Sequence, residues 1–191
     1  MSLRHILLGM LSEPASGYDL KKEFNQSLQH FWRAELSQIY PQLQKLETEG
    51  LLESSAGESS KGPPRRIYHR TAKGRDELVE WLADGPKVGE ERIGYLAQVY
   101  FLENLGDREK ILSFMEELRS YMADWLEQLR ETERSWQAAD PRYPDSLPDE
   151  QFYQQLTLAM GLTKVKANLD WCETTLERIR VRGKYVSSAP V

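Results

Sequence analysis

Two long segments in the second half of the chain carry apolar residues that recur alternately every four and every three positions. The first segment has this spacing at Ile111, Met115, Leu118, Met122, Trp125 and Leu129. The second has it at Leu158, Leu162, Val165, Leu169, Cys172, Leu176 and Ile179. A repeat of 3.5 residues predicts helices that pack along one another through a single apolar seam.

Each of these segments extends over roughly 30 residues, which corresponds to a helix about 45 Å long. Helices of this length cannot bury their seams on a small domain alone. We therefore expect the two helices to pack against each other and, most simply, against a second copy of the chain. The second seam, from Leu158 to Ile179, is the predicted dimerisation surface.

Glycine- and proline-rich stretches indicate where the chain divides. Gly85-Pro86 with Gly89 separates the two halves, and residues 138–148, which contain three prolines, separate the two long helices. The 191 residues suffice for two small domains. We predict a mainly α fold with a domain at 1–85, a linker at 86–92, a helical dimerisation domain at 93–181 and a flexible tail at 182–191.

The first half of the chain predicts three helices. The first has a short apolar stripe at Ile6, Leu7, Met10 and Leu11. Ser16 and Asp19 have the spacing of a capping box, and helical spacing continues at Leu20, Phe24 and Leu28. The third helix is expected to begin near Ser37, because Pro41 is tolerated only within about the first turn. Its inner face is Ile39, Leu43 and Leu46, and Gly50 ends it.

A hairpin and a fourth helix follow. Residues 51–55 and 65–70 have the composition of strands, and the Gly-, Ser- and Pro-rich residues 56–64 join them. Thr71 can cap a helix with an inner face of Leu78, Trp81 and Leu82. Three helices followed by a two-stranded hairpin is the order of a winged helix-turn-helix domain.

The side chains exposed by this arrangement suit double-stranded DNA. The outer face of the third helix carries Gln38, Pro41, Gln42 and Lys45. Glutamine can bond to adenine in the major groove, and Lys45 can reach a phosphate. Free N–H groups near Ser37 favour a phosphate, and Tyr18 and Lys22 can touch the flanking backbone. The hairpin carries Lys61, Arg65 and Arg66, which suit a DNA groove but could also be solvated loop charges.

The charge distribution is uneven. The net charge is −5, but residues 1–75 hold 11 Lys and Arg against 8 Asp and Glu. A basic first half followed by an acidic second half fits a chain that meets DNA with one domain. The overall acidity supports the alternative of a winged-helix module that binds a protein instead.

The sequence resembles a known family through a series of short motifs. These are LRHILLGML at 3–11, SGYDL at 16–20, SQIYPQLQKLE at 37–47, EGLL at 49–52, RRIY at 65–68 and TAKGR at 71–75. They resemble the N-terminal domain of PadR transcriptional regulators. The second half is similar to the helical C-terminal domain of the longer members, which include the AphA group of virulence activators.

This resemblance implies a homodimeric regulator, usually a repressor, that binds a partly palindromic operator. It places Tyr18, Ser37, Gln38, Tyr40 and Lys45 in the DNA-facing helices, and Lys61, Arg65 and Arg66 in the wing. The ring of Tyr40 could instead pack on the hairpin and leave only its hydroxyl toward DNA. Some members lose DNA on binding phenolic acids or flat aromatic drugs, so the implied effector is a small hydrophobic or aromatic molecule.

Other functions find little support in the sequence. It contains no Walker, G-x-S-x-G or G-x-G-x-x-G motif, and no catalytic set of residues, so we expect no enzyme and no cofactor. The histidines lack the spacing of metal ligands, and the tryptophans fit core packing better than a ligand pocket. Cys172 is the only cysteine, occupies a seam position and is predicted to be buried. A cytoplasmic protein fits this cysteine content, and no apolar run is long enough for a membrane helix.

Overall fold

The computed structural model describes residues 3–28, 31–32, 34–57, 65–89 and 93–186. The chain forms two compact units, residues 1–90 and 91–191, here called the N-terminal and C-terminal units. The boundary between them falls inside the predicted linker. In the described part of the chain, no helix combines the length and the apolar character that crossing a membrane requires.

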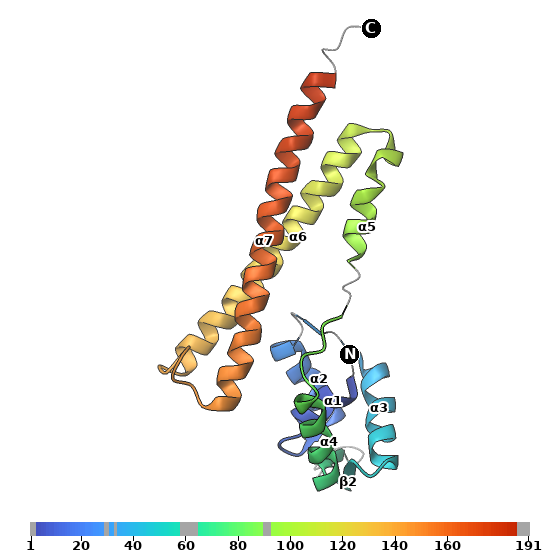
Figure 1. Cartoon of the computed structure of the whole chain (residues 1–191), viewed down its shortest axis with the longest axis vertical. Helices are drawn as coiled ribbons and strands as arrows, with labels where there is room; N and C mark the ends of the chain where they lie inside the picture. Colours follow the sequence, from blue (N-terminus) through green and yellow to red (C-terminus); the bar gives the residue numbers. More distant parts are fainter. Residues whose placement is uncertain (1–2, 29–30, 33, 58–64, 90–92, 187–191) are drawn as a thin grey trace. The chain divides into compact units, whose positions relative to one another are not determined.

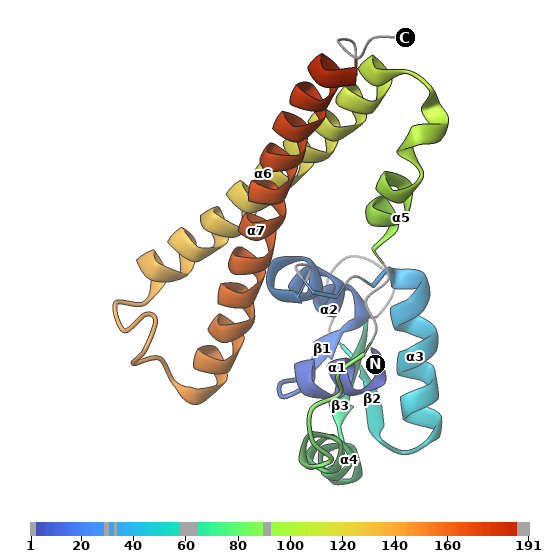
Figure 2. The ribbon, with the colours of Figure 1, turned by 45° about the horizontal axis from the view of Figure 1, so that its top comes forward.

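The N-terminal unit contains four helices and a small sheet (Figure 1). Helix α1 is Leu3–Met10, α2 is Gly17–Glu23 and continues into the π-helical turn η1 at Phe24–Leu28, α3 is Leu36–Thr48, and α4 is Ala72–Ala83. Strands β1 (Ala15–Ser16), β2 (Leu52–Ala56) and β3 (Arg66–Arg70) form an antiparallel sheet in the order β1-β3-β2 (Figure 2). The predicted winged helix-turn-helix is confirmed.

Local signals place three ends of these elements where the sequence predicts. Ser16 caps α2, because its hydroxyl accepts from the N–H of Asp19 at 3.2 Å. Thr71 caps α4 through the N–H of Gly74 at 3.1 Å. Gly50 has φ +73°, and the N–H of Leu51 donates to the carbonyl of Leu46, which is the paired-bond ending that favours glycine after a helix.

One apolar cluster holds the N-terminal unit together. It contains Leu7, Leu8, Leu11, Leu20, Phe24, Ala34, Ile39, Leu43, Leu46, Leu51, Leu52 and Tyr68. Leu78 packs against this cluster, and the Trp81 ring stacks on the His5 ring. The prediction for Leu82 is wrong, because its side chain is 63% exposed on the outer side of α4.

The C-terminal unit is built on two long helices. Helix α5 is Gly94–Tyr100, a 3-10 turn η2 follows at Leu102–Leu105, α6 is Arg108–Ala139 and α7 is Asp149–Val186. Helices α6 and α7 lie side by side as an antiparallel pair (Figures 1 and 2). The predicted flexible tail begins too early, because residues 182–186 continue α7.

Residues of the two predicted seams are buried where α6 and α7 pack against each other. Met115, Met122 and Leu129 of α6 and Leu158, Val165, Cys172 and Leu176 of α7 are buried. Trp125 packs against the cluster that Leu126, Leu129, Leu158 and Val165 form. Cys172 is buried as predicted, and burial raises the pKa of its thiol. Leu126 also lies in the contact, although it is outside the predicted α6 seam.

Candidate DNA-binding surface

Helix α3 is held by its apolar face. Its buried residues Ile39, Leu43 and Leu46 recur at helical spacing and belong to the core, while α1 and α2 pack against the helix. Because one stripe of α3 is fixed inward, the opposite stripe must face solvent. The orientation of this polar face is therefore determined by the packing of the whole N-terminal unit.

The outer face of α3 presents the polar side chains that the sequence predicts. Ser37, Gln38 and Lys45 are exposed, and Gln42 is half-buried at the edge of the face. Gln44 is also exposed and was missed. At 100° per residue, Gln44 lies closer than Gln42 to the direction opposite the buried stripe, so its helical position was the available signal.

The N-terminus of α3 differs from the prediction at one position. The helix begins at Leu36 and its N-cap is Glu35, not Ser37. The backbone N–H of Glu35 donates to Gln38 Oε1 at 3.0 Å, and Lys21 Nζ lies 2.7 Å from the Ala34 carbonyl and 3.0 Å from Glu35 Oε2. The side-chain oxygen of Gln38 thus accepts a hydrogen bond within the chain. The side-chain NH₂ of Gln38 is the group available to donate a hydrogen bond to DNA.

Tyr40 packs against the start of α2. A Cβ at Gly17 would lie 2.6 Å from Tyr40 Cε1, so only glycine allows this approach. The ring therefore lies against the start of α2, and its hydroxyl is also close enough to Tyr68 of β3 to influence the pKa of that residue. The Tyr40 side chain remains 43% exposed, which leaves part of it on the surface.

Helix α2 presents Tyr18 in its first turn and Lys22 in its last turn, and both are exposed. The Ser16 hydroxyl donates to Asp19 Oδ2 at 2.6 Å, and this bond is the main reason that the pKa of Asp19 is lowered. Arg65 and Lys22 lower this pKa further through their positive charges. Asp19 is thus ionised and hydrogen-bonded within the cap of α2. It lies close enough to Arg65 and Lys22 for their positive charges to stabilise its carboxylate.

Arg66 is bound within the fold. Its Nη2 donates to both carboxylate oxygens of Glu47 at 2.8 and 2.7 Å, and its Nε donates to the Ser54 hydroxyl at 2.7 Å. The guanidinium also lies 5.6 Å from the centre of the Tyr68 ring. These contacts tie α3 to the hairpin, so Arg66 positions the two elements relative to each other.

The acidic residues at the end of α3 are paired. The Ser54 hydroxyl donates to Glu47 at 2.6 Å, and this bond together with Arg66 lowers the pKa of the Glu47 carboxyl. Glu49 forms an ion pair with Arg4 of α1. The exposed Arg65 lies at the start of the hairpin's second strand, and the predicted Lys61 lies outside the described residues.

The predicted dimerisation seam lies inside the C-terminal unit. Leu158, Val165, Cys172 and Leu176 are buried in a structure of one chain, and Leu162, Leu169 and Ile179 are half-buried. Leu162 and Leu169 pack against the α6–α7 cluster. The seam is therefore occupied before a second copy is present. Large apolar side chains are exposed elsewhere in the unit, among them Tyr100 at 80% and Phe101 at 61%.

The N-terminal unit defines a class of protein. A helix-turn-helix whose second helix exposes a polar face, followed by an antiparallel hairpin, is the winged-helix arrangement of DNA-binding proteins. The chain belongs to the PadR family: residues 6–80 match the "Transcriptional regulator PadR-like family", and residues 91–180 match "Virulence activator alpha C-term". It is thus a transcriptional regulator of the longer PadR type, and not an enzyme.

Similarity to individual proteins extends over nearly the whole chain. The negative transcriptional regulator PadR of Bacillus subtilis is 30% identical over 179 residues, which are 93% of this chain and 97% of that protein. The structure of B. subtilis PadR with operator DNA has a TM-score of 0.79, with 27% identity, 93% of this chain and 98% of that chain covered. The Vibrio cholerae virulence activator AphA has a TM-score of 0.72 and 26% identity, with 95% and 99% covered.

Proposed function

We propose that the chain is a sequence-specific DNA-binding repressor that acts as a homodimer in the cytoplasm. The observation that carries this proposal is the polar outer face of α3, fixed by the core beside the exposed start of α2 and the hairpin. The similarity to B. subtilis PadR, which has a structure in complex with operator DNA, supports DNA binding.

In this proposal the surface residues have different roles. Gln38, Gln42 and Gln44 reach base edges from α3, and Ser37, Tyr40 and Lys45 contact bases or phosphates around them. The remaining contacts are made to the flanking phosphates and grooves by Tyr18, Lys22, Lys61 and Arg65. Arg66 acts through Glu47 by holding the hairpin against α3.

The dimer is proposed because one winged domain covers only half of a palindromic site. A second copy would place two α3 helices about 34–36 Å apart, one turn of DNA. We assign the contact between copies to the C-terminal unit, where the predicted seam packs α7 on α6. Exposed apolar side chains such as Tyr100 and Phe101 supply surface for the partner.

A small aromatic effector is the third part of the proposal. B. subtilis PadR has a structure with p-coumaric acid, with a TM-score of 0.73 and 28% identity over 93% of this chain and 95% of that chain. We propose that a molecule of this class releases the operator by favouring a dimer whose two α3 helices no longer match successive grooves. Titrating p-coumaric acid into the protein–operator complex should then lower the bound fraction in a saturable way.

The DNA-binding proposal is tested on genomic fragments selected by the purified full chain. Fluorescence anisotropy with a selected and a scrambled duplex, each at several salt concentrations, separates base reading from phosphate contacts. Gln38→Ala should reduce the preference for the selected duplex. Arg65→Ala should weaken both duplexes and lower the salt slope by about 1.

Gln128→Ala and Arg178→Ala, at exposed positions of α6 and α7, are the matched controls and should leave both properties unchanged. If the wild-type chain binds no duplex in a salt-dependent manner, the DNA-binding proposal is wrong and a protein-binding winged helix takes its place.

A further inference from the structure

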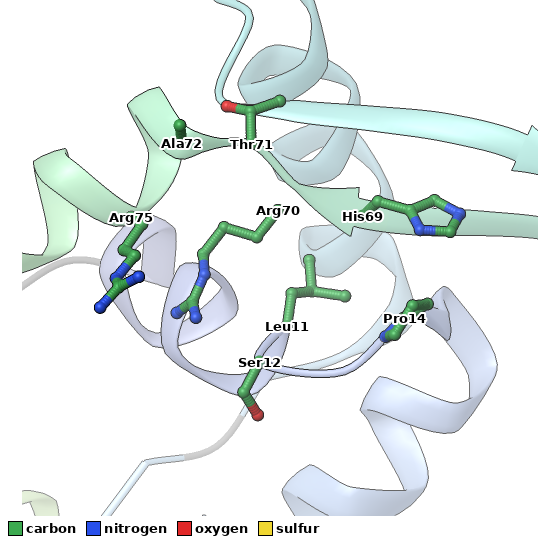
Figure 3. A pocket seen from close by; sticks show the side chains of 8 residues that line it. All are labelled: Leu11, Ser12, Pro14, His69, Arg70, Thr71, Ala72 and Arg75. Carbon is green, nitrogen blue, oxygen red and sulfur yellow. The ribbon is translucent and has the colours of Figure 1, made fainter.

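A cationic pocket lies where the C-terminal end of α1, the end of β3 and the start of α4 meet. Its volume is about 330 Å³, and its lining includes Leu11, Ser12, His69, Arg70, Thr71 and Arg75. Figure 3 shows the guanidinium groups of Arg70 and Arg75 pointing in the same direction, with His69 at the other end of the pocket. All the lining residues belong to the N-terminal unit, so the packing of one compact unit brings them together.

The pocket concentrates positive charge that no carboxylate balances. None of its lining residues is acidic, and Glu13, which lies between two lining residues in the sequence, is not part of the lining. Within the part of the chain that the structure describes, neither Arg70 nor Arg75 forms an ion pair. Two guanidiniums that share a concave surface strengthen the attraction for an anion, because their fields add.

One of the two guanidiniums is held in place before any ligand arrives. Arg70 Nη1 donates to the carbonyl of Leu8 at 2.8 Å, while Arg70 itself is paired with Leu52 in the sheet. A guanidinium carries five N–H donors in a fixed plane, so this single bond leaves others available. Arg75 belongs to α4, which Thr71 caps, and its side chain is exposed. A ligand here therefore contacts the guanidinium of Arg70, which is held in place, and that of Arg75, which can adjust its position.

Neutral donors and acceptors add to the two charges. Ser12 and Thr71 are among the lining residues, and the Thr71 hydroxyl is held by a bond to the Gly50 carbonyl at 2.9 Å. The His69 Nε2 lies 2.9 Å from the Ser55 hydroxyl, which fixes the ring across the pocket. The lining also includes the apolar Leu11, so the pocket can accept a small organic body as well as an anionic group.

We propose that this pocket binds a small organic phosphate, with the phosphate monoester between Arg70 and Arg75. Two neighbouring positive charges match the dianion of a phosphate monoester better than a single carboxylate does. The volume is at the lower end of the range for small-molecule pockets, which is about 300–1,000 Å³. No residue of α3 lines the pocket, so a small ligand fits the observations better than a DNA backbone reaching there from the outer face of α3.

The test measures phosphate binding by the full chain without DNA, so its outcome does not depend on the proposed DNA binding. Inorganic phosphate and glycerol phosphate are titrated at constant ionic strength, with acetate as the monoanion control, while the thermal unfolding midpoint is followed. We expect a saturable rise with both phosphates and none with acetate at the same concentration. Phosphorus-31 line broadening with the same samples reports binding directly.

Arg75→Gln is the decisive variant, because the Arg75 side chain makes no bond that holds the fold together within the described residues. It should weaken phosphate binding about tenfold, the loss expected for one charge-assisted contact. Arg75→Lys keeps the charge but not the planar guanidinium. Its affinity for phosphate should lie between those of the wild type and Arg75→Gln. Arg178→Gln removes the same charge from an exposed position on α7 and should bind phosphate as the wild type does.

Three outcomes overturn the proposal. A rise that does not saturate and is equal in Arg75→Gln and Arg178→Gln is general charge screening. A saturable rise that acetate reproduces shows a carboxylate site instead. If phosphate does not bind but Arg75→Gln weakens duplex binding and lowers its salt slope, the pocket is part of the DNA-binding surface.

Discussion

The two units of this chain bury apolar surface in different ways. In the N-terminal unit, three helices, the short turn after η1 and the sheet enclose one cluster, and its buried side chains come from segments between Leu7 and Tyr68. In the C-terminal unit, helices of 32 and 38 residues share a seam while aromatic side chains of α5 and its C-terminal end remain exposed. The comparison indicates that the N-terminal unit encloses its core within one chain, and the exposed aromatic side chains support the proposed contact between copies through the C-terminal unit.

The largest expected effect tests whether the N-terminal unit is complete. Leu43→Ala removes a fully buried side chain from the inner face of α3 and leaves a cavity. We expect the free energy of unfolding of the full chain to fall by about 3 kcal/mol. Urea unfolding followed by circular dichroism measures it. The adjacent exposed Gln44→Ala should change stability by no more than about 0.5 kcal/mol, and equal effects of the two variants would contradict the burial argument.

The next effect tests whether the C-terminal unit needs a second copy. Replacing Tyr100 and Phe101 together by serine removes an exposed aromatic pair whose ring centres are 4.9 Å apart. If these rings contact a partner, self-association should weaken at least about tenfold, as for residues that dominate an interface. Sedimentation equilibrium at several protein concentrations measures this.

Val88→Ser is the control for this double substitution, because Val88 is 94% exposed and lies in the N-terminal unit. Its association should equal that of the wild type. If the double variant also associates like the wild type, the partner covers another face of the C-terminal unit.

The sequence predicted the features that local spacing determines. The capping pair Ser16 and Asp19, the ending at Gly50, the cap at Thr71 and the apolar seams each depend on residues a few positions apart, and all are present in the structure. The outer face of α3 followed from the same helical periodicity. The family resemblance placed these elements in the right order.

Features that depend on distant residues were missed. Strand β1 has only two residues and exists because Ala15 and Ser16 pair with Tyr68 and Ile67. The ion pair of Arg66 with Glu47, nineteen positions earlier, has no local signal in the sequence. The cationic pocket brings together three segments and has no signal within any one of them.

A smaller effect sharpens the comparison within the N-terminal unit. Arg66→Ala should lower the free energy of unfolding by about 0.5–1 kcal/mol, because its side chain is 51% exposed and solvent screens its attraction to Glu47. The pKa of Glu47 is lowered in the folded chain, so the unfolded chain binds its proton more readily. The stability that this carboxylate contributes is therefore full above its unfolded pKa of about 4.5 and lost as pH falls through the folded pKa.

Urea unfolding between pH 7 and pH 3.5 measures this dependence. The decline with falling pH should be shallower in Arg66→Ala than in the wild type. Arg75→Ala is the matched control, since Arg75 is exposed in the same unit and forms no ion pair among the described residues, and its decline should follow the wild type. A parallel decline in Arg66→Ala and the wild type would show that Ser54 alone maintains the Glu47 carboxylate.

The smallest effect concerns the contact between α1 and α4. The His5 ring stacks on Trp81 with the ring centres 4.8 Å apart, its Nε2 lies 3.7 Å from Glu77 Oε1, and its buried Nδ1 has no hydrogen-bond partner among the described residues. Burial is the main reason that the pKa of His5 is lowered, and the Arg4 charge adds to it, although Glu77 opposes the shift. As pH falls, His5 therefore binds a proton in the unfolded chain before it does so in the folded chain.

Stability should consequently begin to fall below the unfolded histidine pKa of about 6.5 and stop falling, for this group, below the folded pKa. His5→Phe keeps the stacked ring and removes the titration, so this part of the decline should disappear when urea unfolding is followed from pH 7.5 to pH 5. His69→Phe, in the same unit, should retain it. If both variants decline as the wild type does, the α1–α4 contact does not depend on the protonation of His5, and the stability of the N-terminal unit in this range reflects its apolar core alone.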